Sequence, residues 1–330
     1  MRQVKVVRVF IALNLAMCMS TANAVDRGQQ GVEGEMVEVY EPSTIGYTKD
    51  NDDVPFMDFT VSLKYRFLRQ WMGNLTSLEN ERLYFAFTGR FGMYIGDRHS
   101  SPVIGKSFNP KLFWRHITDE TYNDFHPLNA GSRPEIRLIR GYMDFGYAHE
   151  SNGQSIDSPE EYATAQVNSE KPEYANDNIS RGWDYLQFVW KKTLTGNSQH
   201  RLSMYTDLKY FLHRGLMQGR AEEYNVWENN PEGKARKSVN GISELLEYEN
   251  LWHVPAKYEN RPVLANPRVL LRYETGYQTP FKYGTLRLEV GAQLMEFPVT
   301  LWVQQGYNSD LAMYYRKVTS YGLELKMGGF

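Results

Sequence analysis

A histidine and a serine two residues apart are the first residues in this sequence that could do chemistry together. They are His149 and Ser151, at the end of a segment in which apolar and polar residues alternate as in a β-strand. Residues i and i+2 of a strand project from the same face about 6–7 Å apart, so a histidine base and a serine nucleophile can meet there. Alternate positions before His149 are mostly apolar, namely Tyr147, Phe145, Met143 and Ile139. The candidate pair therefore lies on the apolar face of its strand.

A histidine that acts as a general base is usually oriented by an acceptor on its second ring nitrogen. The next alternating segment offers one candidate, Asp184, which shares its face with bulky apolar residues at positions 186, 188 and 190. Because His149 and Ser151 also lie on an apolar face, we expect all three side chains on one outward surface of two neighbouring strands.

The same alternation recurs in several segments of the chain. They are residues 58–67, 83–95, 136–150, 183–192, 267–278, 283–294 and 317–327. A soluble β-sandwich also alternates, but faces rich in aromatic residues, backed by charged ones, suit a lipid-facing exterior and a polar lumen. We predict an all-β fold, a transmembrane antiparallel β-barrel of about 12 strands.

The first 24 residues have a basic start, an apolar run from Val9 to Met19 and small residues at 22–24, as an export signal does. We predict a signal peptide over 1–24, an N-terminal segment over 25–53 that can include a first strand near 45–48, and a barrel domain over 54–330. The single cysteine, Cys18, falls within the signal. Cysteine catalysis and a disulfide framework are therefore excluded for the exported chain.

The formal net charge of −2 gives no basic surface for nucleic acid. Aromatic residues make up 14 % of the chain, yet no apolar stretch approaches the roughly 18 residues of a spanning helix. An exported chain of this kind can still reside in a membrane as a closed barrel. Long connections over 96–109, 151–182 and 213–239 suit outer loops, and short ones near 195–197 and 296–298 suit periplasmic turns.

Two strings in the sequence resemble the motifs H-x-S-N-G and S-R-S-W-N of the outer membrane phospholipase A family. They are His149-Glu150-Ser151-Asn152-Gly153 and Ser180-Arg181-Gly182-Trp183-Asp184. The resemblance implies a twelve-stranded barrel that hydrolyses acyl esters of membrane glycerophospholipids, with phospholipase A1, A2 and lysophospholipase activity. It implies that Ser151 is the nucleophile, His149 the base, Asp184 the residue that orients it and Gly153 the oxyanion donor. It also implies the bacterial outer membrane as location, with the site toward the outer leaflet.

The same resemblance implies a Ca²⁺ ion bound at the interface of a homodimer. The ligands carried over from the family are Ser180, the carbonyl of Gln154 and a serine of an earlier outer loop of the partner subunit, for which Ser100 is the best match. The match is tightest from about residue 83 to 192 and looser from Asp58 to Phe330.

Two departures from the family pattern bear on the chemistry. Asp184 stands where the family has asparagine, so a potential anion sits at a membrane surface, where its desolvation is costly but is offset by an imidazolium. We expect activity to survive with a shifted pH optimum. The two motifs are also separated by an insertion with six acidic residues and one lysine. Its composition suits a solvated, mobile loop, or a source of a further calcium ligand such as Asp177.

Two other classes of function remain open at this point. One is a barrel without a catalytic role, a pore or an adhesin, whose conductance or binding would not depend on Ser151 or calcium. The other is an inactive homologue of the phospholipases, in which Asp184→Asn would restore activity.

Overall fold

The computed structural model describes residues 37–51, 55–67, 80–96, 103–123, 136–196, 200–218, 234–250, 257–258, 261–262, 264–295 and 297–327. The predicted signal peptide lies outside these residues. Twelve strands form the barrel: β2 (Ser43–Asp50), β3 (Phe56–Phe67), β4 (Glu81–Tyr94), β5 (Ile104–Asn123), β6 (Ile136–Ser151), β7 (Gly182–Gly196), β8 (His200–Phe211), β9 (Gly241–Asn250), β12 (Leu264–Gly276), β13 (Thr285–Leu294), β14 (Phe297–Gly306) and β15 (Val318–Met327).

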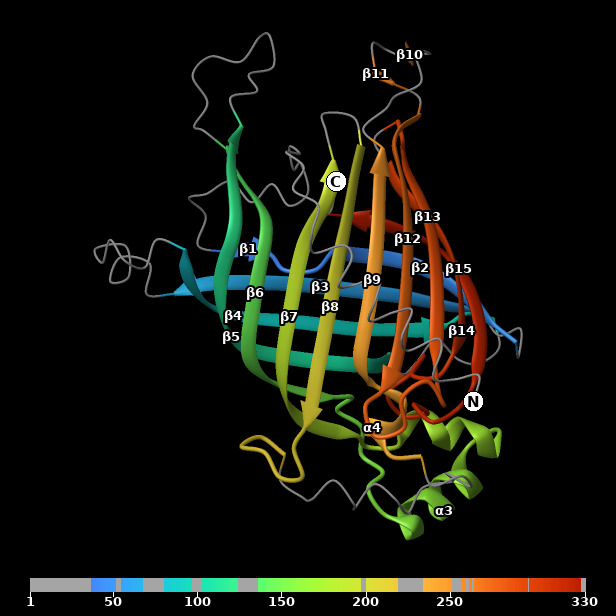
Figure 1. Ribbon diagram of the computed structural model, residues 1–330. Helices are drawn as coiled ribbons and strands as arrows, with labels where there is room; N and C mark the ends of the chain where they lie inside the picture. The colour runs from blue at the N-terminus through green and yellow to red at the C-terminus, as the bar shows by residue number, and fades with distance from the viewer. Residues whose placement is uncertain are drawn as a thin grey trace, which may run out of the picture.

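These strands close into one antiparallel sheet. The last strand, β15, pairs with β2, with Leu323 opposite Tyr47, and so joins the two ends of the sheet. Figure 1 shows the strands side by side around a single barrel, with α3 (Pro159–Asn168) and α4 (Arg236–Val239) at its lower end. The predicted all-β antiparallel barrel is confirmed. Among the helices of the described residues, none has the length and apolarity needed to cross a membrane.

The chain before the barrel adds a short strand, β1 (Val37–Val39), which pairs with β3 beyond the point where β2 pairs with it. Positions 45–48, given above as a possible first strand, lie in β2. A separate two-stranded sheet joins β10 (Lys257–Tyr258) to β11 (Arg261–Pro262). The segment predicted as a loop over 96–109 is shorter, because β5 already begins at Ile104.

Side chains alternate across the barrel wall as the sequence predicts. On β3, Val61 and Leu63 are exposed to the outside, whereas Ser62 and Lys64 are buried. On the last strand, β15, Tyr321 and Leu323 are exposed and Lys326 is buried. The outer surface is thus apolar and the interior polar, which is the arrangement of a barrel that faces lipid.

Ion pairs fill much of the interior. Arg115 donates through Nε and Nη2 to the two oxygens of Asp144, each at 2.7 Å, and both side chains are buried. Arg287 binds Glu289 at 2.7 Å and Glu324 at 2.8 Å. A cavity of about 620 Å³ remains between the charged side chains of the lumen. Each buried charged side chain of these pairs loses contact with water inside the barrel, and its partner of opposite charge compensates for that loss.

An apolar cluster lies inside the barrel behind the ends of β6 and β7. Trp183 and Tyr185 point inward there and pack with residues of the β14–β15 connection, including Tyr314, whose ring meets Trp183 edge-on at 5.4 Å. Arg236 of α4 binds Glu150 at 3.0 Å in the same region. Apolar packing and an ion pair therefore support the inside of the wall at the point where the outside carries His149 and Ser151.

We predict that Arg115→Ala lowers the free energy of unfolding by about 3–5 kcal/mol, because it leaves the buried Asp144 carboxylate without its partner. Urea unfolding in detergent micelles, followed by tryptophan fluorescence, measures the change. Arg90→Ala is the control, because the Arg90 side chain is 52 % exposed and its contact with Glu41 is long, at 3.7 Å. This substitution should lower the free energy of unfolding by less than about 1 kcal/mol. Equal losses in the two variants would contradict this role for the buried pair.

Candidate active site

The pairing of β6 with β7 sets the candidate site. His149 lies directly opposite Asp184, and Ser151 lies opposite Gly182. Nδ1 of His149 is 2.6 Å from Oδ1 of Asp184. Because Nδ1 is engaged by the carboxylate, a neutral His149 that donates there has Nε2 free to accept a proton. Histidine and aspartate therefore have the relative geometry of a base and the acid that orients it.

Gly182 lies beside His149 and Ser151 and has no side chain of its own. A Cβ atom at this glycine would lie 3.5 Å from both Cε1 of His149 and Cβ of Ser151. Within the described part of the chain, no direct hydrogen bond joins His149 to Ser151, and such contacts often tighten only when substrate binds. The two side chains lie on the same face of β6, beside the position of Gly182 on β7.

Asp184 is fully buried, although its strand position faces outward. The segment from Leu212 to Gln218, which follows β8, folds over it. Oδ2 of Asp184 accepts the backbone N–H of Met217 at 2.8 Å and of Gln218 at 2.9 Å, and the hydroxyl of Tyr147 also donates to it. With His149, four donors surround the carboxylate, which favours its charged form.

Gly215 allows this segment to approach so closely. A Cβ atom there would lie 1.8 Å from Oδ2 of Asp184, which no side chain can tolerate. The segment is also tied down nearby, since the N–H of Leu216 donates to the hydroxyl of Tyr147 at 2.8 Å. Asp184 was expected to share a lipid-facing surface with His149 and Ser151, and the segment instead shields it from that surface.

The turn after Ser151 is fixed by Asn152. Its buried side chain donates to the carbonyl of Ile179 at 2.7 Å and accepts the N–H of Arg181 at 2.9 Å. Gly153 follows with φ of +63°, a left-handed conformation that favours glycine. The expected oxyanion donor, the N–H of Gly153, thus belongs to a turn that is locked against the start of the neighbouring strand.

The expected calcium ligands are only partly described. Ser100 lies outside the described residues. Gln154 and Ser180 lie in the two segments next to the paired ends of β6 and β7. The N–H of Asn152 donates to the carbonyl of Arg181, and the N–H of Ser180 donates to the carbonyl of Ile156 in an isolated parallel bridge between Ile156 and Ile179. Within the part of the chain that the structure describes, no three His, Cys, Asp or Glu side chains gather as a metal site. Two oxygen donors from one chain suit calcium in kind but are fewer than the six to eight, roughly, that it takes.

The acidic insertion contains two helices, which the expectation of a solvated loop did not include. It contains α3 and the 3-10 helix η2 (Pro172–Asn178), and Ile179 behind them is fully buried. Ser158 caps α3 by accepting the N–H of Glu161 at 3.3 Å, and no residue of α3 is buried. Asp177, considered above as a calcium ligand, accepts from Tyr94 at 3.3 Å and lines the lumen cavity.

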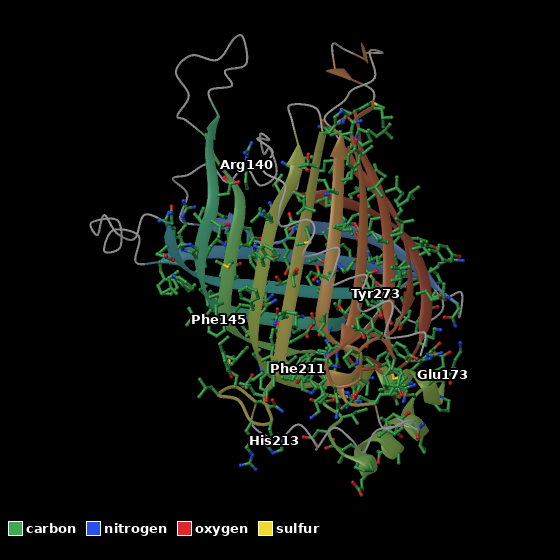
Figure 2. The ribbon with its side chains drawn as sticks, in the orientation of Figure 1. Arg140, Phe145, Glu173, Phe211, His213 and Tyr273 are labelled. Carbon is green, nitrogen blue, oxygen red and sulfur yellow. The ribbon has the colours of Figure 1, made fainter. Side chains whose placement is uncertain are left out.

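Apolar side chains surround the candidate site on the outside of the barrel. Phe108 lies opposite Ser151 on β5 and stacks with Phe87 on β4, with ring centroids 6.4 Å apart. Leu186 and Phe145 are exposed on the other strands. Figure 2 shows Phe145 toward the same lower end of the barrel as Phe211 and His213, with Arg140 toward the opposite end. The polar side chains of the candidate site therefore lie next to exposed apolar side chains on the outer surface of the barrel.

Sequence reasoning missed the segment from Leu212 to Gln218 and the role of Tyr147. Tyr147 was interpreted only as one of the apolar residues of its strand face, because alternation reveals the face but not what a hydroxyl meets. The return of the segment over Asp184 depends on backbone N–H groups, which every residue type except proline has. Gly215 was the one available signal, and a single glycine in a loop is by itself a weak one, because glycine is common in turns of every kind.

Solved structures of bacterial phospholipases resemble this chain. Outer membrane phospholipase A from Escherichia coli matches with a TM-score of 0.54 and 17 % identity, covering 89 % of this chain and 99 % of that one. An outer membrane phospholipase dimer with bound calcium from Salmonella typhi matches with a TM-score of 0.56 and 15 % identity, covering 92 % and 98 %. No family model and no curated protein matches the chain. The chain therefore shares the barrel fold of outer membrane phospholipase A.

Proposed function

We propose that this protein is a calcium-dependent phospholipase A of the bacterial outer membrane. The observation that carries the proposal is the 2.6 Å contact between His149 and Asp184 on the outer face of the barrel, two residues from Ser151. A catalytic site on the outside of a barrel suits a substrate that is itself part of the membrane. The shared fold of solved phospholipases and the two sequence motifs support the same activity.

The reaction follows from the roles of three residues. Oγ of Ser151 attacks the ester carbonyl of a glycerophospholipid while Nε2 of His149 takes the hydroxyl proton, and Asp184 stabilises the imidazolium. The N–H of Gly153 donates to the oxyanion of the tetrahedral intermediate. The intermediate collapses to an acyl-serine, and the leaving alcohol of the lysophospholipid takes the proton from His149. Water, activated by His149, then releases the fatty acid and restores Ser151.

The substrate reaches Ser151 without leaving the bilayer. The apolar side chains beside the site, Phe108, Phe145 and Leu186, are exposed in the position where acyl chains would lie. The polar atoms of the site then meet the ester groups, which lie between the chains and the headgroup. Orientation toward the outer leaflet belongs to this proposal, as does hydrolysis at the A1 and A2 positions and of lysophospholipids.

Calcium and a second copy of the chain complete the proposed site. Ser180 and the carbonyl of Gln154 would hold the ion together with Ser100 of the partner subunit, and bound calcium would supply positive charge that stabilises the oxyanion. Dimerisation along the apolar outer faces would bring the ligands together. Activity would then depend on association as well as on the ion.

The ion pairs of the lumen favour this proposal over a pore. Arg115, Arg287 and their acidic partners pair with one another along the inner face of the wall, and the apolar cluster around Trp183 packs inside the barrel near the site. The paired side chains of the candidate site, in contrast, lie on the outside of the wall.

We predict that Ser151→Ala lowers calcium-dependent release of fatty acid from phospholipid by at least about 10³-fold, because no other group forms the acyl-enzyme. Mixed micelles of detergent and phospholipid are the substrate, and released fatty acid is titrated. Ser169→Ala, at the C-terminal cap of α3, should keep the wild-type rate. Persistent hydrolysis in Ser151→Ala would refute the assignment of the nucleophile.

We predict that Ser180→Ala raises the calcium concentration needed for half-maximal activity by about tenfold or more, because one oxygen ligand is lost. Activity is titrated with calcium after removal of the ion by chelation, and dimerisation is followed by analytical ultracentrifugation at each concentration. Ser155→Ala, at an exposed neighbour of Gln154, serves as the control and should leave the titration unchanged. Identical titrations for Ser180→Ala and the wild type would exclude Ser180 as a ligand.

A further inference from the structure

We infer that the segment Leu212–Gln218, hereafter the positioning loop, requires a carboxylate at position 184 and holds it in place for His149. On this inference, aspartate is the residue that the loop requires at position 184, and its presence in place of asparagine does not impair the site. The structural part of the inference depends only on the hydrogen bonds of the loop. The catalytic part of the inference rests on the proposed function.

The two oxygens of Asp184 are both used as acceptors. Oδ1 faces Nδ1 of His149 at 2.6 Å. Oδ2 faces the N–H groups of Met217 and Gln218, at 2.8 and 2.9 Å, and the hydroxyl of Tyr147. A backbone N–H can only donate. The two N–H groups of the loop therefore require a hydrogen-bond acceptor at the position of Oδ2.

An asparagine side chain cannot meet this demand in either orientation. With its oxygen toward His149, its NH₂ group faces the N–H groups of Met217 and Gln218, and donors meet donors. With its oxygen toward the loop, the NH₂ group faces Nδ1 of His149, which must then accept and leave the proton on Nε2. That tautomer cannot take the proton of Ser151. Only a carboxylate serves the loop and the base together.

The remaining contacts hold the loop in register with β7. The N–H of Leu212 donates to the backbone carbonyl of Asp184 at 2.9 Å, and the N–H of Asp184 donates to Oε1 of Gln218 at 3.2 Å. Gly215 supplies the clearance, since a Cβ there would meet Oδ2 of Asp184 at 1.8 Å. The loop is thus anchored to the backbone at both ends, and its contact with the carboxylate depends on a missing side chain.

Hydrogen exchange tests the structural part without reference to activity. In detergent micelles, we expect Asp184→Asn to speed amide exchange at Met217 and Gln218 by about tenfold or more, the equivalent of one or more lost hydrogen bonds. The N–H of Leu212 is an internal control, because its acceptor is the backbone carbonyl of residue 184 in both proteins; its exchange should change by less than about threefold. Unchanged exchange at Met217 and Gln218 would overturn the inference whether or not the protein hydrolyses lipid.

A double-mutant cycle tests the catalytic part. We expect Asp184→Asn to lower kcat by about 100-fold or more, and Gly215→Ala to lower it by about tenfold in the wild-type background with KM little changed. In the Asp184→Asn background, Gly215→Ala should have an effect below about threefold, because the contact it disturbs is already lost. Tyr147→Phe, which removes one donor from the same carboxylate, should follow the pattern of Gly215→Ala.

Gly276→Ala is the matched control for the cycle. A Cβ at Gly276 would lie 2.1 Å from the backbone of Ser238, so the clash is similar in size but does not involve Asp184. Its effect on kcat should be the same in the wild-type and Asp184→Asn backgrounds. If Gly215→Ala were likewise additive with Asp184→Asn, or if Asp184→Asn kept or raised kcat, the loop would not position the carboxylate for catalysis. If the wild type hydrolysed no phospholipid, the proposed function would fail and the exchange result would still stand.

Discussion

The register between β6 and β7 is the constraint on which the rest of the site depends. It pairs every residue from Gly141 to Ser151 with one from Lys192 to Gly182, and so sets His149 against Asp184 and Ser151 against Gly182. A slip of one residue would turn Asp184 into the lumen, because side chains alternate across the sheet. Closure of the barrel and the apolar cluster around Trp183 oppose such a slip. The chemistry on the outside is thus fixed by packing on the inside.

A buried carboxylate near lipid is costly unless every oxygen is satisfied. Four hydrogen-bond donors surround the Asp184 carboxylate, and the positioning loop shields it from the outer surface of the barrel. Two of the donors are backbone N–H groups, which cannot rotate away as side chains can. The same contacts that keep Asp184 charged also fix the direction in which it faces His149, so the electrostatic stabilisation of the carboxylate and its orientation have one structural cause.

Alternation of residue types was enough to predict the barrel, its outward apolar faces and the outward strand positions of His149 and Asp184. Each of these depends on a local rule, the twofold period of a strand. The folded insertion with α3 was not foreseen, because its acidic composition also suits a solvated loop. The loop over Asp184 could not be foreseen, because backbone donors leave no mark in the residue types and the approach of Leu212–Gln218 to β7 is a tertiary event. Sequence motifs located the chemical groups, and only the fold showed what surrounds them.

Neighbouring residues at the end of β6 face opposite sides of the barrel wall. His149 and Ser151 face outward, whereas Glu150 between them faces inward and binds Arg236 at 3.0 Å. Since the wall is a single layer of backbone, the two sets of side chains are separated by parity alone. A residue on the inner face therefore shares one backbone with the outward-facing residues on either side of it. Because inward-facing residues such as Glu150 lie on the same strand as His149 and Ser151, a substitution in the lumen can disturb the outer site without touching any residue exposed there.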